Sequence, residues 1–196
     1  MSTLIDRREA LRKTALLMGA AVSASTVSAF LYGCKTRPNL NYKPAFFTED
    51  QASLVSQGAE IILPKTDTPG ATDVGVPNFI DMLVKDCYKE EDQKKFLDGL
   101  HDFDQNAIKA FGSRFIEGSP EQQLDYLKKT HDDAVNAAKA DPKLPRPFIL
   151  KLKELTMLGY FVSEPGATKV LQYIAVPGAY HGCVPLAEAG NGKQWA

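Results

Sequence analysis

The sequence predicts an all-α protein with about five to six helices, placed between an N-terminal export signal and an irregular C-terminal tail. Three observations support this class. Apolar residues recur at helical spacing in five separate stretches. Capping residues or a proline stand at the start of several of these stretches. No run of strict apolar–polar alternation is long enough to predict a strand.

The composition is that of one soluble globular domain. The chain has 196 residues, of which 44% are hydrophobic and 24% are charged, and this excludes a wholly disordered chain. Its 23 basic and 24 acidic residues give a formal net charge of -1. Because there is no basic excess, the sequence does not indicate a nucleic-acid-binding protein.

Residues 1–33 have the pattern of an export signal. Arg7 and Arg8 form a twin arginine, and the stretch from 14 to 33 carries no charge. This stretch is long enough for a transmembrane helix, but it is only weakly apolar, which fits a secretory signal better. The twin arginine favours export by the Tat route, and a general Sec signal or a membrane anchor is the alternative.

The export signal ends in LYGC at positions 31–34, which resembles a bacterial lipobox. A lipid on Cys34 would make this residue the mature N-terminus and would tether the protein to a membrane. Ordinary cleavage near residues 28–29, or a retained anchor, is the alternative. The expected location is therefore the periplasm, with a membrane tether through Cys34.

Residues 34–47 contain two prolines and two asparagines and show no periodicity, so they predict a spacer. The helical domain is expected to span 48–196. Thr48 and Gln51 have the spacing of a capping box at the start of its first helix. Pro64 marks the end of that helix, because proline cannot continue the hydrogen-bond pattern.

Turn-forming residues are dense at 64–75 and predict a loop. Pro77 then suits the first turn of a second helix, whose apolar face is expected to bury Cys87. A third helix around 96–111 has the clearest apolar stripe in the chain. This arrangement places His101 on the polar face of the third helix.

The second half of the domain predicts two more long helices. A capping pattern at 119–122 begins the fourth, and prolines separate it from a fifth that starts near Phe148. Residues 156–162 are apolar nearly all round, so this end is expected to be deeply buried or covered by a partner. A short helix is expected through 170–171, and the chain from Val176 onward is expected to be irregular.

Residues able to carry out chemistry are few. The chain has only three histidines, and nucleophilic catalysis needs a base beside the nucleophile. His101 is expected in solvent and His131 in a core or interface. His181 lies two residues from Cys183, but no second pair completes a metal site, and the haem-attachment motif is absent. No catalytic residue and no metal ligand is therefore predicted, and no phosphate-binding or dinucleotide motif occurs.

Two cysteines remain after Cys34. In an oxidising periplasm, Cys87 and Cys183 are a candidate disulfide that would join the second helix to the tail. The alternative is a buried free Cys87, with Cys183 bonded to another chain.

Six short motifs in the mature chain form a distinctive set. They are EIILP at 60–64, TDTPGA at 66–71, VP at 76–77, FID at 79–81, LGYF at 158–161 and a spaced Tyr, Val, Pro, Gly, Tyr, Gly, Cys pattern from 173 to 183. Together they resemble the gluconate 2-dehydrogenase subunit 3 family over about residues 48–185.

This resemblance implies a non-catalytic small subunit, with no turnover alone, in a complex that oxidises a sugar or polyol. Its partner would be a large periplasmic FAD-dependent oxidoreductase of the glucose-methanol-choline (GMC) type, and a c-type cytochrome often completes such complexes. The small subunit would hold no cofactor, since FAD and haem c belong to the partners. It would bring the export signal to a large subunit that lacks one. A lipobox is not a general mark of this family, so the tether could be Cys34 or the cytochrome.

The predicted partner-binding surface combines the apolar helix end with aromatic residues of the tail, because aromatic side chains commonly anchor interfaces. Its residues are Met157, Tyr160, Phe161, Tyr173, Tyr180 and Trp195. The alternative function is a stand-alone periplasmic lipoprotein that binds a small ligand or a metal through the 64–75 loop and the tail near Cys183.

Overall fold

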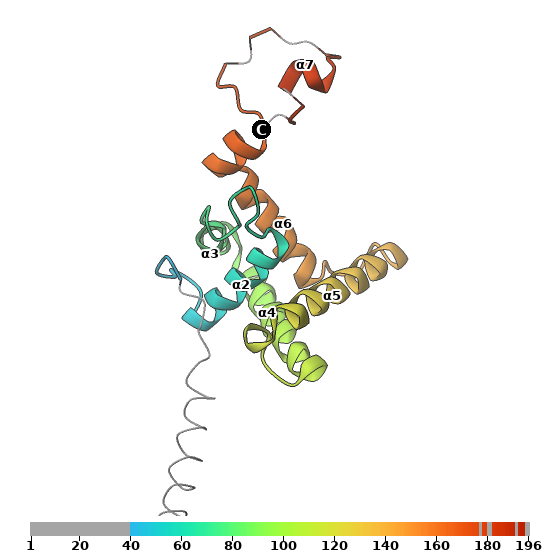
Figure 1. Ribbon diagram of the computed structural model, residues 1–196. Coiled ribbons are helices and arrows are strands. Elements are labelled where there is room, and N and C mark those ends of the chain that lie inside the picture. The colour runs from blue at the N-terminus through green and yellow to red at the C-terminus, as the bar shows by residue number, and fades with distance from the viewer. Residues whose placement is uncertain (1–39, 177, 180–181, 191, 195–196) are drawn as a thin grey trace, which may run out of the picture. The chain divides into compact units, whose positions relative to one another are not determined.

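The computed structural model describes residues 40–176, 178–179, 182–190 and 192–194 (Figure 1). The signal with Arg7 and Arg8, the lipobox with Cys34, and the tail residues Tyr180 and Trp195 lie outside the described residues. All regular elements of the described part are helices, which confirms the all-α prediction. None of these helices is long and apolar enough to cross a membrane.

In the described part of the chain, five longer helices correspond one to one to the five predicted stretches, and three short helical segments accompany them. In chain order the elements are α2 (Glu49–Ile62), α3 (Val76–Cys87), α4 (Glu90–Phe111), η1 (Phe115–Glu117), α5 (Pro120–Ala140), α6 (Phe148–Phe161), η2 (Gly166–Val170) and α7 (Leu186–Gly190). The predicted short helix near 170 is η2, and α7 is a short helix inside the tail that was expected to be irregular.

Local sequence chemistry sets the starts of α2 and α5. The Thr48 hydroxyl accepts a hydrogen bond from the Gln51 N–H at 3.3 Å, and the Gln51 side-chain oxygen accepts one from the Thr48 N–H at 2.9 Å. Ser119 and Gln122 form the same reciprocal pair at the start of α5. Each cap stabilises its helix by about 1 kcal/mol, because it satisfies backbone donors that have no partner within the helix.

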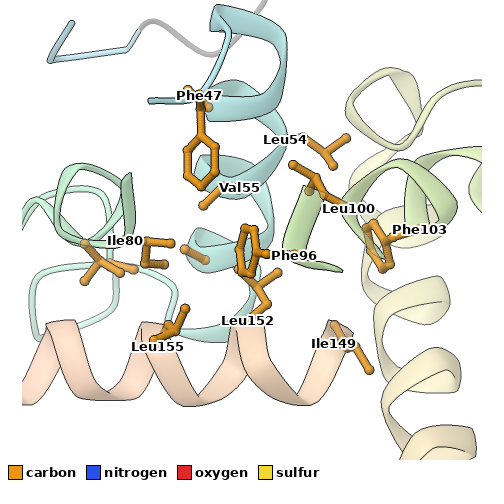
Figure 2. Close-up of a cluster of buried hydrophobic side chains, with 14 of the residues drawn as sticks. Phe47, Leu54, Val55, Ile80, Phe96, Leu100, Phe103, Ile149, Leu152 and Leu155 are labelled. Atoms are coloured by element: carbon orange, nitrogen blue, oxygen red, sulfur yellow. The ribbon is translucent and has the colours of Figure 1, made fainter. Parts of the chain in front are cut away.

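The core lies where α6 packs against α2, α3, α4 and α5. Figure 2 shows one residue from each of four helices pointing into a single cluster: Val55, Ile80, Phe96 and Leu152. The Phe96 ring also stacks on Phe47, with ring centroids 5.7 Å apart. The stripe predicted for the third helix is therefore its core face, with Phe96 almost fully buried.

The N-terminal strap, defined here as residues 40–47, corrects the predicted spacer. Phe47 is buried in the core, and the strap backbone is held by Asp81 of α3, which is fully buried. The Asp81 carboxylate accepts hydrogen bonds from the N–H groups of Ala45 at 2.6 Å, Phe46 at 3.2 Å and Phe47 at 2.7 Å. The strap is therefore part of the packed domain, because it has apolar side chains to bury and an acceptor for its donors.

Candidate partner-binding surface

Helix α6 has one buried and one exposed apolar face. Leu152, Leu155 and Thr156 are buried against the other helices. Met157, Leu158 and Val162 are 41%, 46% and 61% exposed, and these three residues are called the outer face of α6 below. The end of the helix that was expected to be either buried or covered is thus buried on one side and open on the other.

Close packing by neighbouring elements decides which side of α6 is buried. A Cβ on Gly159 would lie 2.6 Å from Cδ1 of Phe79, so α3 approaches the helix backbone at a point where only glycine fits without a shift. The Tyr160 hydroxyl donates a hydrogen bond to the Pro69 carbonyl at 2.8 Å and is 4% exposed. Tyr160, predicted to contact a partner, is therefore a core residue that anchors the 64–75 loop. Phe161 is half-buried beside it.

The C-terminal tail after η2 adds more exposed apolar side chains. Its exposed large hydrophobic residues are Tyr173, Ile174, Val176, Val184 and Leu186. The tail closes back on its own start, since the Gln172 N–H donates to the Gln194 carbonyl at 2.7 Å and the Lys193 ammonium donates to the Lys169 carbonyl at 2.6 Å (Figure 1). Tyr173 is exposed, and a residue that contacts a partner has to be exposed in the isolated chain.

Exposed apolar residues are concentrated in this part of the chain. Eight of the twelve exposed large hydrophobic residues recorded for the described part lie between 157 and 186. The other four are isolated on α3, α4, α5 and the loop after α5, which is ordinary for a soluble protein. Contiguous exposed apolar patches commonly mark interaction sites, so this part of the chain is the candidate partner-binding surface.

The 64–75 loop is organised by Glu60 of α2. One carboxylate oxygen accepts from the Thr72 N–H at 2.9 Å and from the Thr72 hydroxyl at 2.6 Å, and the other accepts from the Lys65 N–H at 3.2 Å. A Cβ on Gly70 would lie 2.8 Å from the Lys65 nitrogen and against Glu60. The distinctive motifs at 60–64 and 66–71 therefore have a structural role: they bend this loop and hold it against α2 and α6.

Two charged residues of the loop, Lys65 and Asp73, form an ion pair with each other. The Lys65 ammonium lies 3.1 Å from the Asp73 carboxylate, and this hydrogen bond, with a second from the Gly70 N–H, lowers the pKa of Asp73. In the described part of the chain, no group of three His, Cys, Asp or Glu side chains could hold a metal ion.

The two described histidines are not paired with a nucleophilic side chain. His101 is exposed on α4, as predicted. His131 is partly buried on α5, with Nδ1 3.2 Å from the Asp132 carboxylate and Nε2 3.1 Å from the Lys153 ammonium. Neither histidine hydrogen-bonds to a Ser, Thr or Cys side chain among the described residues. His181 lies outside the described residues.

Both described cysteines are exposed free thiols. Cys87 is the last residue of α3 and is exposed, which corrects the expectation that it is buried; the last buried residue of the helix is Val84, one turn earlier. The bond between Cys87 and Cys183 is not formed in the structure. It stays a prediction for exported protein, to be checked by mass spectrometry of a non-reduced digest.

An ion pair between Asp104, which is buried, and Arg114, which is partly exposed, fixes the turn between α4 and α5 and was missed by sequence reasoning. The Asp104 carboxylate accepts from the Arg114 guanidinium at 2.8 Å and from the Phe115 N–H at 2.9 Å. The hydrogen bond that Arg114 donates to Asp104 raises the pKa of Arg114. Gln123 donates to the Phe115 carbonyl at 2.9 Å and completes the turn. This cluster is a folding element, because all of its buried polar groups bind the local backbone or one another.

The fold and surface define a class: a small helical protein with exposed apolar side chains on α6 and in the C-terminal tail. The family described as Gluconate 2-dehydrogenase subunit 3 matches residues 49–178, which is more than half of the chain. The protein therefore belongs to the gluconate 2-dehydrogenase subunit 3 family, which implies an oxidoreductase partner. Comparisons with curated proteins and with solved structures gave no match.

Proposed function

We propose that this chain is a non-catalytic accessory subunit that binds and stabilises a large FAD-dependent oxidoreductase of the GMC type. The observation that carries the proposal is the exposed apolar region formed by the outer face of α6 and the tail, in a member of a family defined as an enzyme subunit. The substrate of the complex would be a sugar or polyol, and a c-type cytochrome would accept its electrons.

The outer face of α6 is too small to account for a stable complex by itself. Complete burial of a Leu or Met side chain stabilises by about 1.5–3 kcal/mol. The three side chains of the outer face are already half-covered, so their burial supplies only a few kcal/mol, whereas a micromolar complex requires about 8 kcal/mol. The tail, with Tyr173 and Leu186, must therefore contribute to the same interface.

The proposal includes export and location. The twin arginine at Arg7 and Arg8 supports Tat export of this chain together with its partner, and the lipobox supports a lipid tether on Cys34 in the periplasm. In this proposal the partner lacks a signal of its own, so the small subunit escorts it out of the cytoplasm.

The alternative of a stand-alone lipoprotein that binds a metal through the 64–75 loop has less support. Glu60 and Asp73 already bind groups within the loop and its neighbours, so their carboxylates are not available as ligands without breaking these contacts.

The proposal is tested by purifying the tagged chain from its native cells and identifying what accompanies it. We expect a large protein with bound flavin absorbance in the periplasmic or membrane fraction, and no dehydrogenase turnover by the chain alone. In a deletion strain, the large protein should remain in the cytoplasm. Normal periplasmic dehydrogenase activity in that strain would contradict the escort role.

A further inference from the structure

Helices α2 and α3 form a layer that separates the N-terminal strap from α6. On α3, the Phe79 ring packs against Gly159 of α6, whereas the Asp81 carboxylate binds the backbone of the strap. Successive residues of a helix are about 100° apart around its axis, so these two side chains, two positions apart, leave α3 in nearly opposite directions. The strap and α6 therefore lie on opposite sides of α3.

Helix α2 shows the same arrangement. Gly58 faces α6, where an added Cβ would lie 2.9 Å from Cδ2 of Leu152. Ser56 and Glu60 line a pocket of about 350 Å³ together with Leu40 of the strap. Each of these two residues is two positions from Gly58, or about 160° around the helix from it. The strap and α6 thus lie on opposite sides of α2 as well.

The outer face of α6 is turned away from this layer. In Figure 2, Leu152 and Leu155 of α6 point into the buried cluster from the side opposite Phe47. Met157 and Leu158 lie about 140° and about 120° around the helix from Leu152, in opposite directions. The order across the domain is therefore strap, α2 with α3, α6, and then the outer face. Packed helices are about 8–10 Å apart, so the outer face lies roughly 20 Å from the strap through the protein.

The chain that connects Cys34 to the domain is short. Leu40 already packs against the core, so residues 35–39 alone link a lipid on Cys34 to the packed domain. An extended chain spans at most about 3.6 Å per residue, so Leu40 would be held within about 22 Å of the bilayer, whereas a free spacer over 34–47 would reach about 50 Å. To bring the outer face of α6 to the same bilayer, the linker would have to pass around the domain, and that path is longer than its reach.

We propose that the mature domain lies on the membrane in one orientation, with the strap side toward the phospholipid headgroups and the outer face of α6 away from the bilayer. The flavoprotein is then bound on the membrane-distal side of the domain. The exposed side chains of the strap are Asn41, Lys43 and Ala45, which suit polar headgroups and offer little apolar area for insertion among acyl chains. This inference rests on the lipid tether and the partner-binding surface of the proposed function, and it adds the side of the domain that each of them occupies.

The test uses the full exported chain, purified with its lipid and incorporated into phosphatidylcholine vesicles that contain a headgroup-labelled acceptor lipid. A donor dye is attached to the strap through Lys43→Cys, or to the outer face through Leu158→Cys, in a background with Cys87→Ser and Cys183→Ser. Both probe variants should melt like the background chain, because the replaced side chains are exposed. We expect more energy transfer to the lipid from the strap probe than from the outer-face probe, since the strap lies closer to the bilayer.

A lengthened chain is the matched control. Insertion of about twenty Gly and Ser residues after Arg37 should remove most of the difference between the probes, because a long flexible linker lets the domain turn over. Persistence of the full difference would contradict the short tether as its cause.

Equal transfer from the two probes in a vesicle-bound chain, or greater transfer from the outer-face probe, would overturn the proposed orientation and leave the accessory role intact. A full exported chain that does not bind vesicles would overturn the lipid tether and the orientation together. Partner binding does not enter this experiment, so its result is independent of whether the outer face of α6 binds a flavoprotein.

Discussion

Asp81 shows how one side chain joins two distant parts of the chain. Its buried carboxylate accepts from three backbone donors of the strap, and no basic side chain among the described residues is in hydrogen-bond contact with it. Such charge-assisted bonds are stronger than neutral ones, and their loss leaves buried donors unpaired. Asp81, the last residue of the FID motif at 79–81, thus has the structural role of holding the strap.

We expect Asp81→Ala to lower the free energy of unfolding by about 2–4 kcal/mol, because three N–H groups lose their acceptor. The matched control is Asp102→Ala on the exposed face of α4, which should change stability by less than about 0.5 kcal/mol. Urea denaturation of both variants measures the difference. Equal effects would contradict the role assigned to Asp81.

A second prediction concerns alkaline pH. Burial, and to a lesser extent the charge of Asp81, raises the pKa of Tyr42, and burial also raises the pKa of Tyr126. In the unfolded chain these groups ionise at about pH 10. The folded state resists ionisation, so stability is unaffected below about pH 10 and falls as the pH rises above it.

Melting temperatures between about pH 8 and pH 12 check this prediction, and Tyr42→Phe should make the alkaline decrease shallower. A decrease of the same slope in the variant would show that Tyr42 is not responsible.

At the scale of elements, most helices could be predicted because their signals are local. The capping pairs at Thr48 and Ser119 and the stripe of α4 each lie within one segment of the sequence. The strap could not be predicted, since its fixed conformation depends on Asp81, more than thirty residues away. The prediction that Tyr160 contacts a partner was also wrong. A helix that is apolar on all sides has no periodicity to indicate which face is buried.

The two faces of α6 can be compared with one leucine-to-alanine substitution on each face. Leu152 is 1% exposed, so Leu152→Ala should cost about 2–5 kcal/mol through lost burial and a cavity. Leu158→Ala on the outer face should cost less than about 1 kcal/mol, since this side chain is already 46% exposed and leaves no closed cavity. Urea denaturation gives both values. A similar cost at the two positions would contradict the two-faced description of the helix.

At the scale of the whole molecule, the sequence predicted the family and the helical domain, while the structure showed that residues 40–47 pack with the domain and located the exposed apolar side chains. A pocket between the strap, α2 and α3 was not foreseen, because its lining residues come from three separate segments. The export signal, Cys34, Tyr180 and Trp195 stay predictions, since they lie outside the described residues.

Export provides a prediction that does not depend on the domain structure. Arg7→Lys combined with Arg8→Lys should leave the protein in the cytoplasm, because the twin arginine directs Tat export. Cys34→Ala should release soluble protein or slow signal cleavage, since the acyl anchor is lost. Cell fractionation with immunoblotting measures both. Unchanged membrane association of the Cys34 variant would rule out the lipid tether.

The central claim is that the outer face of α6 binds a flavoprotein. It is tested most directly by co-purifying that partner with Leu158→Asp and with the matched control Leu124→Asp, an exposed leucine on α5. The account predicts that both variants melt like the wild type. Leu158→Asp should weaken partner binding by roughly tenfold or more, because it places a charge in an apolar contact, while Leu124→Asp retains the partner. Retention of the flavoprotein by a folded Leu158→Asp variant, or equal loss from both variants, would contradict the claim.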